Sequence, residues 1–487
     1  MDEHNSSTAV TRSVLSHRKR AIRDRADRQA PERDRWILRN AYSYQEHHRY
    51  LRFLIPKGLK VLELGCGNGH TLAALEPAVG VGVDFSEAMV DVARSHYPHL
   101  EFFVGDVEDP QCLEDLNHPF DVILLSDTIG ELEDVESTLK ALRKLCSPDT
   151  RLVVAYYSNL WEPILRAAEI FGQAMPKGQQ NWLSTLDTMG IMSLADFDVV
   201  KRDWRQLIPK RLLGIGPVVN RYVATLPLIR RLCLRNYIVA RTAKQIVDEC
   251  SATVVIPCKN ERDNIEPAVR RLADFCDDLE ILFVEGGSHD GTKEEIERVI
   301  DAFPERDIKL IVQGGKGKGD AVRSAFAVAR GDALMILDGD LTVPPEWLPR
   351  FLEALRSGRG EFINGSRLVY PMQGQAMRFL NHLANRIFAL LFTWLLNQPL
   401  TDTLCGTKVL WRRHYEQIEA NRDYFGDFDP FGDFDLLFGA SKLNLKIVEV
   451  PVRYASRSYG ETQISRFQHG WLLLRMVVFA YRKLKAT

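Results

Sequence analysis

The chain has 487 residues, of which 45% are hydrophobic and 26% are charged, and its formal net charge is −2. This length exceeds one ordinary domain of about 150 residues, so we expect two or three domains. The composition is that of a globular protein and leaves ample apolar surface for a core. It gives no sign of a nucleic-acid partner, and none is expected.

Cysteine usage and the lack of long apolar runs indicate where the protein works. The eight cysteines form no Cys-x-x-Cys pair and lie mostly in apolar contexts, as reduced core residues of a cytosolic protein do. Residues 1–39 are polar and rich in arginine, so we expect no signal peptide. No uninterrupted apolar stretch reaches the roughly 18 residues that span a bilayer. The expected location is the cytoplasm.

Basic residues gather in two segments. Residues 201–244 hold eleven Lys or Arg against one acid, Asp203, and residues 441–487 hold nine against Glu449 and Glu461. Such segments fit an anionic partner, either a phospholipid surface or a sugar phosphate. Peripheral contact with the inner face of a membrane therefore joins the expected cytoplasmic location.

In chain order, residues 1–30 are expected to be disordered or to form a loose charged helix. A packed amphipathic helix is predicted over residues 32–54. An apolar strand at residues 60–64 then runs into a turn with glycines at positions 65, 67 and 69. Glycine is needed where the backbone turns tightly and approaches a ligand closely, so this turn is a predicted binding site.

Three further strands each end at an acid, namely Asp84, Asp106 and Asp127. Asp84 has the spacing at which an acid on the second strand binds ribose hydroxyls. A nicotinamide-dinucleotide fold is the alternative. The Gly-x-Gly-x-Gly pattern lacks the six-residue fingerprint of that fold and argues against it.

This succession of motifs resembles the class I S-adenosylmethionine-dependent methyltransferases. The resemblance implies a domain at residues 31–245 whose sheet has seven strands, completed by a strand at 151–156 and by antiparallel strands at 199–207 and 234–240. It implies S-adenosyl-L-methionine as the cofactor. The implied cofactor-binding residues are Glu63, Gly65, Gly67, Gly69, Asp84, Asp106 and Val107. No residue identifies the methyl acceptor, for which the pocket candidates are Tyr156, Tyr157, Asn159, Asn181 and Trp182.

The second half alternates buried strands with helices. The β-branched run at 253–257 is typical of a parallel strand covered on both faces. Further strands are predicted at 280–285 and 308–313, and helices at 264–275, 292–303 and 318–330. This order predicts a doubly wound parallel sheet with its ligand at the carboxyl ends of the strands, and the domain boundary is expected at 245–251.

A short apolar strand of this half ends in Asp338-Gly-Asp340 and is stopped by Pro344 and Pro345. Oxygen ligands suit hard cations, so Asp338 and Asp340 are the predicted ligands of Mg²⁺ or Mn²⁺. The cation would hold a diphosphate.

Together with the motifs around Asn260 and Asp290 and the run Gly315-Lys-Gly-Lys-Gly319, this pair resembles the family 2 glycosyltransferases with a GT-A fold, in the dolichyl- or polyprenyl-phosphate mannosyl- and glucosyltransferase branch. The resemblance implies a second doubly wound, Rossmann-like domain at residues 250–487. The implied nucleotide-sugar contacts are Pro257, Asn260, Glu261, Glu285, Asp290, Lys318 and Asp338. Arg367 is placed near an acceptor phosphate, and Asp433 or Asp435 near the acceptor, where a hydroxyl would need a general base.

Two departures from the family pattern leave questions open. Glu285-Gly286 stands where two aspartates are usual, so the nucleotide is either UDP or GDP. Gln463 stands where the family has a lysine, which weakens the case for a phosphate acceptor. Apolar helices predicted at 379–396 and 471–481 are too short to span a bilayer, and they either pack on the core or lie in a lipid interface.

The sequence thus predicts a bifunctional enzyme. It would transfer a methyl group and, with a metal ion and inversion, a sugar from a nucleotide sugar to a polyprenyl phosphate or a glycan. The alternatives are sugar transfer to a polysaccharide or small-molecule hydroxyl, and one inactive domain that serves in binding or assembly. The sugar, both acceptors, the order of the reactions and the oligomeric state stay open.

Overall fold

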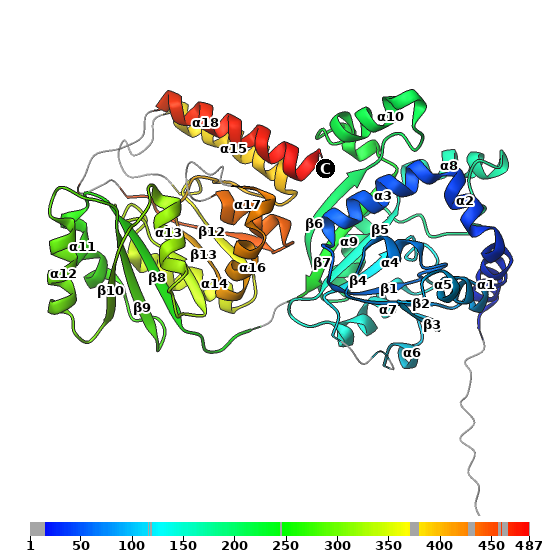
Figure 1. Ribbon diagram of the computed structural model, residues 1–487, viewed down its shortest axis with the longest axis horizontal. Helices are drawn as coiled ribbons and strands as arrows, with labels where there is room; N and C mark the ends of the chain where they lie inside the picture. Colours follow the sequence, from blue (N-terminus) through cyan, green and yellow to red (C-terminus); the bar gives the residue numbers. More distant parts are fainter. Residues whose placement is uncertain are drawn as a thin grey trace, which may run out of the picture. The chain divides into compact units, whose positions relative to one another are not determined.

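Two mixed seven-stranded sheets organise the protein (Figure 1). The computed structural model describes residues 15–114, 116, 119–243, 246–370, 379–426, 434–455, 459 and 466–486. The chain divides into two compact units, Met1–Ala195 and Asp196–Thr487.

The first sheet has the strand order β3-β2-β1-β4-β5-β7-β6. Its strands are β1 (Lys60–Leu64), β2 (Val79–Asp84), β3 (Glu101–Val104), β4 (Val122–Ser126), β5 (Arg151–Tyr157), β6 (Phe197–Arg205) and β7 (Arg235–Thr242). β1 pairs in parallel with β2 and with β4, and β6 pairs with β7 in the antiparallel sense. The predicted seven-stranded sheet is confirmed. The strand order reverses beside β1, and open α/β sheets bind their ligands at such a switch point.

Helices of the first unit precede the sheet and alternate with its strands. They are α1 (His17–Gln29), η1 (Ala30–Glu32), α2 (Arg33–Arg39), α3 (Ala41–Leu54), α4 (His70–Ala74), α5 (Glu87–His96), α6 (Pro110–Glu114), α7 (Val135–Leu142), η2 (Arg143–Leu145), η3 (Asn159–Trp161), α8 (Glu162–Ile170) and α9 (Thr185–Leu194). The helix predicted over 32–54 is interrupted at Asn40, which caps α3.

Residues 17–29 form a packed helix, α1, and are neither disordered nor loose. Ser16 caps it, because its Oγ accepts the Lys19 N–H at 3.0 Å. Ile22 is only 3% exposed. The expectation of a loose N-terminal segment is therefore wrong for this stretch, and the reason is the network of ion pairs described below.

The second sheet has the strand order β10-β9-β8-β11-β13-β12-β14. Its strands are β8 (Ala252–Cys258), β9 (Leu279–Glu285), β10 (Asp307–Val312), β11 (Ala333–Ile336), β12 (Phe362–Ser366), β13 (Lys408–Trp411) and β14 (Ile447–Pro451). β8 pairs in parallel with β9 and β11, as predicted. β13 runs antiparallel to both of its neighbours, so the sheet as a whole is mixed.

The second unit holds the short helices between β6 and β7 and the helices that alternate with the strands of the second sheet (Figure 1). They are η4 (Leu212–Gly214), α10 (Ile215–Val218), η5 (Val219–Val223), η6 (Ile229–Leu232), α11 (Arg262–Arg271), α12 (Thr292–Ala302), α13 (Lys318–Phe326), η7 (Pro345–Trp347), α14 (Leu348–Arg356), α15 (Phe379–Leu396), α16 (Arg412–Ala420), η8 (Arg422–Tyr424), α17 (Phe434–Lys442), α18 (Arg466–Ala480) and η9 (Tyr481–Lys485). Within the described residues, no helix combines the length and hydropathy needed to cross a membrane.

Buried side chains of the central strands form the core of the second unit. Val254 and Ile256 of β8, Phe283 of β9 and Met335 of β11 pack with Phe351 of α14, and all five are at most 1% exposed. The continuous β-branched run of β8 is thus covered on both faces, as its sequence predicts. This rigid sheet fixes the loops that follow its strands.

Candidate active sites

A cavity opens at the carboxyl ends of the strands in the first unit. Its empty volume is about 1050 Å³, and its lining includes residues that follow three neighbouring strands. Gly65 and Gly67 come from the turn after β1, Asp84 ends β2, and Asp106 and Val107 follow β3. Five of the seven predicted cofactor-binding residues therefore meet at one cavity.

Asp84 is tied to the glycine turn. Its Oδ2 accepts the Gly67 N–H at 2.8 Å, and its Oδ1 accepts the Ser86 N–H at 3.0 Å. Burial raises the pKa of Asp84 to about 6. Gly67 has φ +51°, and a Cβ there would come no closer than 4.0 Å to the nearest heavy atom, a nitrogen of Arg33. The turn thus leaves room for a ligand beside an acceptor-only carboxylate.

Glu63 and Gly69 support the turn from outside the cavity lining. Glu63 lies on β1 and is only 2% exposed, and burial raises its pKa well above the usual value. Gly69 has φ +74°, and a Cβ there would lie 2.7 Å from the Phe102 ring. Both positions shape the strand–turn–helix segment, and neither presents a group to the cavity.

Charged residues of α1 and α2 close the cavity, and the sequence analysis missed them. The Lys19 ammonium lies 2.6 Å from Oδ2 of Asp106, and Nη2 of Arg25 lies 2.8 Å from Oε1 of Glu131. Arg33 of α2 also lines the cavity, and its Nε has no hydrogen-bond partner among the residues that the structure describes. The signal was present in the arginine-rich run after Ser16, a residue type that caps helices.

The remaining wall of the cavity follows β4 and β5. Asp127, which follows β4, has φ +64°, a costly backbone conformation for a residue other than glycine. The Lys177 ammonium lies 3.6 Å from Oδ2 of Asp127 and 3.9 Å from the centre of the Tyr157 ring. Tyr157, a pocket candidate, therefore lies beneath a cation. Asn181, a further candidate, donates from its Nδ2 to Leu132 O at 2.7 Å, and neither Tyr157 nor Asn181 is among the residues that line the cavity in the described part of the chain.

The second unit brings its predicted metal ligands to the end of β11. The Lys318 ammonium lies 2.6 Å from Oδ1 of Asp338. Burial acts to raise the pKa of Asp338, but Lys318, Lys408 and Arg367 outweigh it and hold that pKa below its usual value. Oδ1 of Asp340 accepts the N–H and the hydroxyl of the residue two positions on, at 3.1 and 2.8 Å. Both carboxylates are held in place by these bonds.

The loops after β8 and β9 are bonded to each other. Pro257 lies near the end of β8, and Asn260 follows with φ +56°. The Asn260 N–H donates to Oγ of Ser288, and its Oδ1 accepts the His289 N–H, both at 2.9 Å. Oε1 of Glu285 accepts the Ser288 N–H at 2.5 Å. Glu285, which stands where the family pattern has an aspartate, therefore stabilises the turn that contains Ser288.

Asp290 and Glu261 extend this network. Oδ1 of Asp290 accepts from the Thr292 hydroxyl at 2.5 Å, and its Oδ2 accepts the Arg262 N–H at 3.2 Å. Burial acts to raise the pKa of Asp290, but these bonds outweigh it and lower the pKa. Glu261 donates its N–H to Oγ1 of Thr292 at 3.0 Å and accepts from Asn264 at 2.6 Å. The predicted nucleotide contacts thus form one loop assembly.

Arg367 is held by a buried partner. Its Nε and Nη2 donate to the two carboxylate oxygens of Asp402 at 2.7 and 2.8 Å, and Asp402 is 0% exposed. The Arg367 backbone N–H adds a third bond, at 3.0 Å. This fork uses two of the five guanidinium donors. Arg367 can therefore bind an acceptor phosphate only through the guanidinium donors that Asp402 does not use.

The two predicted acceptor-side acids differ in what is known of them. Asp433 lies outside the described residues. Asp435, on α17, faces two cations, with Arg422 at 3.5 Å and Arg323 at 3.8 Å from its Oδ2. Two guanidinium groups therefore already contact this carboxylate.

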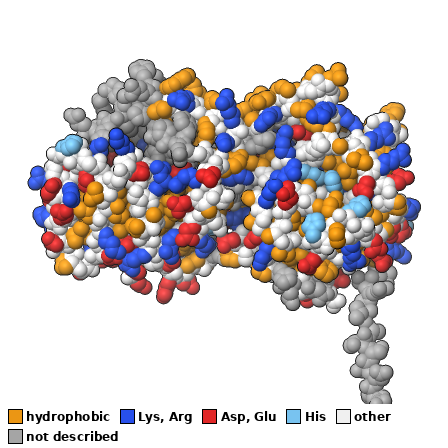
Figure 2. Space-filling model, viewed as in Figure 1, with side chains coloured by type: hydrophobic (Ala, Val, Ile, Leu, Met, Phe, Trp, Pro, Cys, Tyr) orange, Lys and Arg blue, Asp and Glu red, His pale blue; other side chains and the backbone are white. Residues whose placement is uncertain are grey.

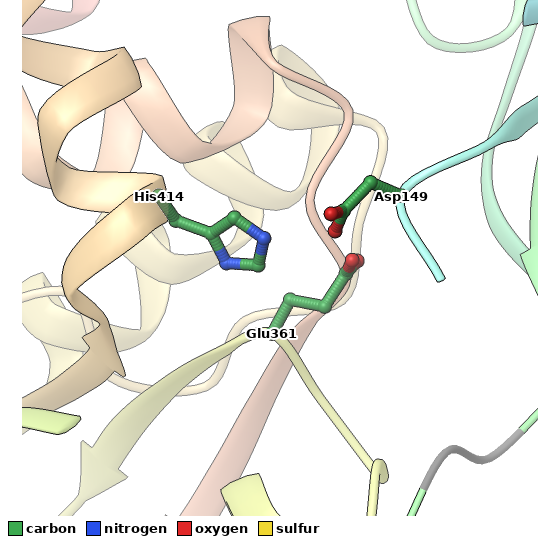
Figure 3. Close-up of side chains that lie close together, drawn as sticks. All are labelled: Asp149, Glu361 and His414. Atoms are coloured by element: carbon green, nitrogen blue, oxygen red, sulfur yellow. The ribbon is translucent and has the colours of Figure 1, made fainter. Parts of the chain in front are cut away.

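Figure 3 draws Glu361 and His414, two residues of the second unit. Glu361 immediately precedes β12, and its Oε2 accepts the Lys446 N–H at 2.9 Å. His414 is buried on α16. The bond to Lys446 gives Glu361 a structural role within this unit.

Each sheet thus places candidate site residues at the carboxyl ends of its strands, in an α/β fold. Two family models agree with this fold class. Residues 16–202 match the methyltransferase domain model, and residues 253–419 match glycosyl transferase family 2. The chain therefore carries a methyltransferase domain followed by a family 2 glycosyltransferase domain. The sequence motifs predicted both.

Curated relatives match the second half of the chain. Glycosyltransferase AglD of Haloferax volcanii is 31% identical over 218 residues, which are 44% of this chain and 34% of that protein. A dolichol-phosphate mannosyltransferase of Pyrococcus furiosus is 29% identical over 219 residues, 44% of this chain and 58% of that protein. The match therefore spans less than two thirds of either relative.

Solved structures resemble each half. A possible histamine N-methyltransferase from Thermotoga maritima covers 45% of this chain and 99% of its own, with 20% identity and a TM-score of 0.35. Glucosyl-3-phosphoglycerate synthase from Mycobacterium tuberculosis, solved with Mn²⁺, UDP and glucosyl-3-phosphoglycerate, covers 48% and 80%, with 19% identity and a TM-score of 0.35. Likeness at this level carries no functional conclusion.

Proposed function

We propose that the chain is a bifunctional enzyme of glycan or glycolipid biosynthesis. One domain transfers a methyl group from S-adenosyl-L-methionine, and the other transfers a sugar, with inversion, from a nucleotide sugar to a polyprenyl phosphate or a glycan. The proposal rests on one observation: in each unit the acids that such a ligand requires follow neighbouring strands and are bonded to the loops around them.

The first cavity fits the methyl donor. Asp84 would accept from the ribose hydroxyls, Asp106 and Val107 would flank the adenine, and Gly65 and Gly67 would let the methionine part approach the backbone. The bound donor supplies a sulfonium methyl group. The chain itself contributes orientation and the exclusion of water, since α1 covers the cavity.

The second site fits a divalent cation, because its donor set is two carboxylates that follow one strand. Asp338 and Asp340 would hold Mg²⁺ or Mn²⁺, which supplies positive charge beside the leaving diphosphate. Lys318 would contribute a further positive charge to that phosphate once it leaves Asp338. The loop assembly of Asn260, Glu285 and Asp290 would border the nucleoside, which is UDP or GDP.

The acceptor is proposed from the relatives. A dolichol-phosphate mannosyltransferase and an undecaprenyl-phosphate transferase of Klebsiella pneumoniae, 26% identical over 219 residues, are both named for lipid phosphates. The alternative is a hydroxyl of a polysaccharide or small molecule. The Arg367–Asp402 fork favours this alternative, because it withdraws guanidinium donors from a phosphate. We assign the enzyme to the cytoplasm, with peripheral contact at the inner face of a membrane.

Thermal unfolding with ligands tests both halves of the proposal. UDP, GDP, UDP-glucose and GDP-mannose would each be added with and without Mn²⁺ to the wild type and to Asp340→Ala. We expect a metal-dependent rise in Tm with one nucleotide, absent in the variant. S-adenosylhomocysteine should raise the Tm of the wild type and not of Asp84→Asn. A nucleotide series without any shift would leave the second domain as a binding or assembly module.

A further inference from the structure

The segment between β6 and β7 exposes an unusual number of apolar side chains. We call residues 206–234 the β6–β7 insertion, and it contains η4, α10, η5 and η6. Leu213 and Leu228 are fully or almost fully exposed, at 105% and 84%. The other exposed large apolar residues of the insertion are Leu212, Ile215, Val218, Tyr222, Leu226 and Leu232. Contiguous exposed apolar surface of this kind marks an interaction site.

The insertion is held in place with these side chains outward. The Asn220 side chain is 3% exposed and bonds to Leu207 N–H at 2.8 Å and to Ile208 N–H at 2.9 Å. The Trp394 indole of α15 donates to Thr225 O at 2.8 Å. These bonds fix the backbone from both sides. The exposed leucines therefore lie on a segment whose backbone is held in place by hydrogen bonds.

All the charged residues of the insertion are basic. No acid occurs between Asp203 and Asp248. Arg211, Arg221 and Arg231 of the insertion are exposed beside its apolar residues. Apolar residues mixed with cations, with no anion among them, form the pattern of segments that lie in the headgroup region of anionic bilayers.

Two helices of the same unit add apolar surface next to the insertion. On α15, Leu383, Ile387 and Leu390 are exposed and lie three or four positions apart, on one face of the helix. α18 has three exposed apolar residues with the same kind of spacing. The exposed apolar residues of α18 are Trp471, Leu474 and Val478. The Tyr481 hydroxyl, directly after α18, donates to Tyr222 O at 3.1 Å and so joins this helix to the insertion. Figure 2 shows hydrophobic side chains gathered over α10 and over α18.

We propose that the β6–β7 insertion docks the protein on an anionic phospholipid bilayer, with its leucines in the acyl boundary and its arginines among the headgroups. A second copy of the chain fits this face less well, because a self-complementary contact would bring its arginines against one another. An anionic bilayer offers the complement to both the apolar and the basic residues. The inference holds for either acceptor class and does not depend on the identity of the sugar.

Vesicle flotation of the full-length protein tests this docking. Vesicles of phosphatidylcholine alone are compared with equal parts phosphatidylcholine and phosphatidylglycerol. We expect the wild type to float with the anionic vesicles only. Leu213→Asp with Leu228→Asp should lower the partition by at least about tenfold, and Arg211→Gln with Arg231→Gln should remove most of the preference for phosphatidylglycerol.

A matched control makes the same kind of substitution, an exposed apolar residue to Asp, in the first unit. Ile170→Asp with Phe171→Asp changes two residues of the first unit that are 82% and 77% exposed, and it should float like the wild type. All three double variants should keep the Tm of the wild type, since the altered side chains are exposed. Equal flotation of the Leu213/Leu228 variant and the wild type would overturn the proposal. So would self-association of the wild type without lipid, abolished by that variant, because a second copy would then cover the face.

Discussion

The ammonium of Lys318 lies 2.6 Å from Oδ1 of Asp338, the first of the two acids at the end of β11. Lys318 begins α13, and the two residues are 20 positions apart in the chain. The carboxylate that would bind a cation therefore has a cation of the protein's own beside it. A divalent ion and this ammonium compete for one oxygen.

This competition predicts that removing the ammonium strengthens metal binding. Lys318→Met should bind Mn²⁺ at least about tenfold more tightly than the wild type in the absence of nucleotide, because a partly buried carboxylate loses the one cation in direct contact with its Oδ1. The same variant should bind the nucleoside diphosphate more weakly. Calorimetric titration with MnCl₂ measures the first effect. Lys309→Met, which breaks an ion pair to Glu280 at 2.7 Å on another strand, is the control. Unchanged Mn²⁺ affinity in Lys318→Met would contradict the competition.

A second prediction concerns the glycine beside the same carboxylate. A Cβ on Gly406 would lie 2.1 Å from Oδ2 of Asp338, so Gly406→Ala must displace that side chain. We expect sugar transfer to fall by about 100-fold, as for a reacting group moved by about 1 Å. The binding of S-adenosylhomocysteine should not change. Gly190→Ala, on α9 with no atom within 4 Å of its Cβ, is the control. If Gly406→Ala transferred sugar at the wild-type rate, the proposal that Asp338 belongs to the active site would be wrong.

The buried fork between Arg367 and Asp402 predicts a loss of stability. Asp402→Asn should lower the free energy of unfolding by about 3–5 kcal/mol, because the guanidinium stays buried without its counterion. Glu346→Gln breaks the exposed pair with Arg271 and should cost less than about 1 kcal/mol. Urea unfolding followed by circular dichroism gives both values. A change in Asp402→Asn as small as in the control would show that Arg367 does not need this partner.

The raised pKa of Asp84 predicts a pH dependence for binding in the first cavity. Since burial places this pKa at about 6, the carboxyl takes up a proton as the pH falls through that value and loses its anionic acceptor. Affinity for S-adenosylhomocysteine should therefore be constant above pH 7 and fall by up to about tenfold per pH unit below 6. Titrations from pH 5 to 8 measure it. Asp84→Asn should bind weakly at every pH, and a midpoint near the ordinary carboxyl value of about 4 would contradict burial as the cause.

Much of the fold could be predicted from the sequence, because strand and turn signals are local. The glycine turn at 65–69 and the acids that end β2, β3 and β11 all lie where their motifs indicate. α15 has the predicted bounds, Phe379–Leu396. In each case a run of apolar residues ends at a glycine or a polar residue, which marks the end of the strand or helix.

The parts that the sequence did not reveal depend on contacts between distant residues. β13 is four residues long and runs against its neighbours, and no local pattern gives the direction of so short a strand. Lys19 and Arg33 belong to the first cavity only because α1 and α2 fold back over it, across a separation of 87 residues in the case of Lys19 and Asp106. Arg367 looked available to an acceptor because its partner, Asp402, lies 35 residues away.

The contacts of the helix that covers the first cavity are in part electrostatic. α1 is held by Lys19 to Asp106, by Arg25 to Glu131 and by Asp27 to the hydroxyl of Ser86 at 2.6 Å, and Arg18 adds a bond to Leu132 O at 2.8 Å. The first two of these contacts are ion pairs, so added salt should weaken them. We therefore expect the residence time of a ligand in this cavity to shorten as the ionic strength rises, independently of the rate of the chemical step.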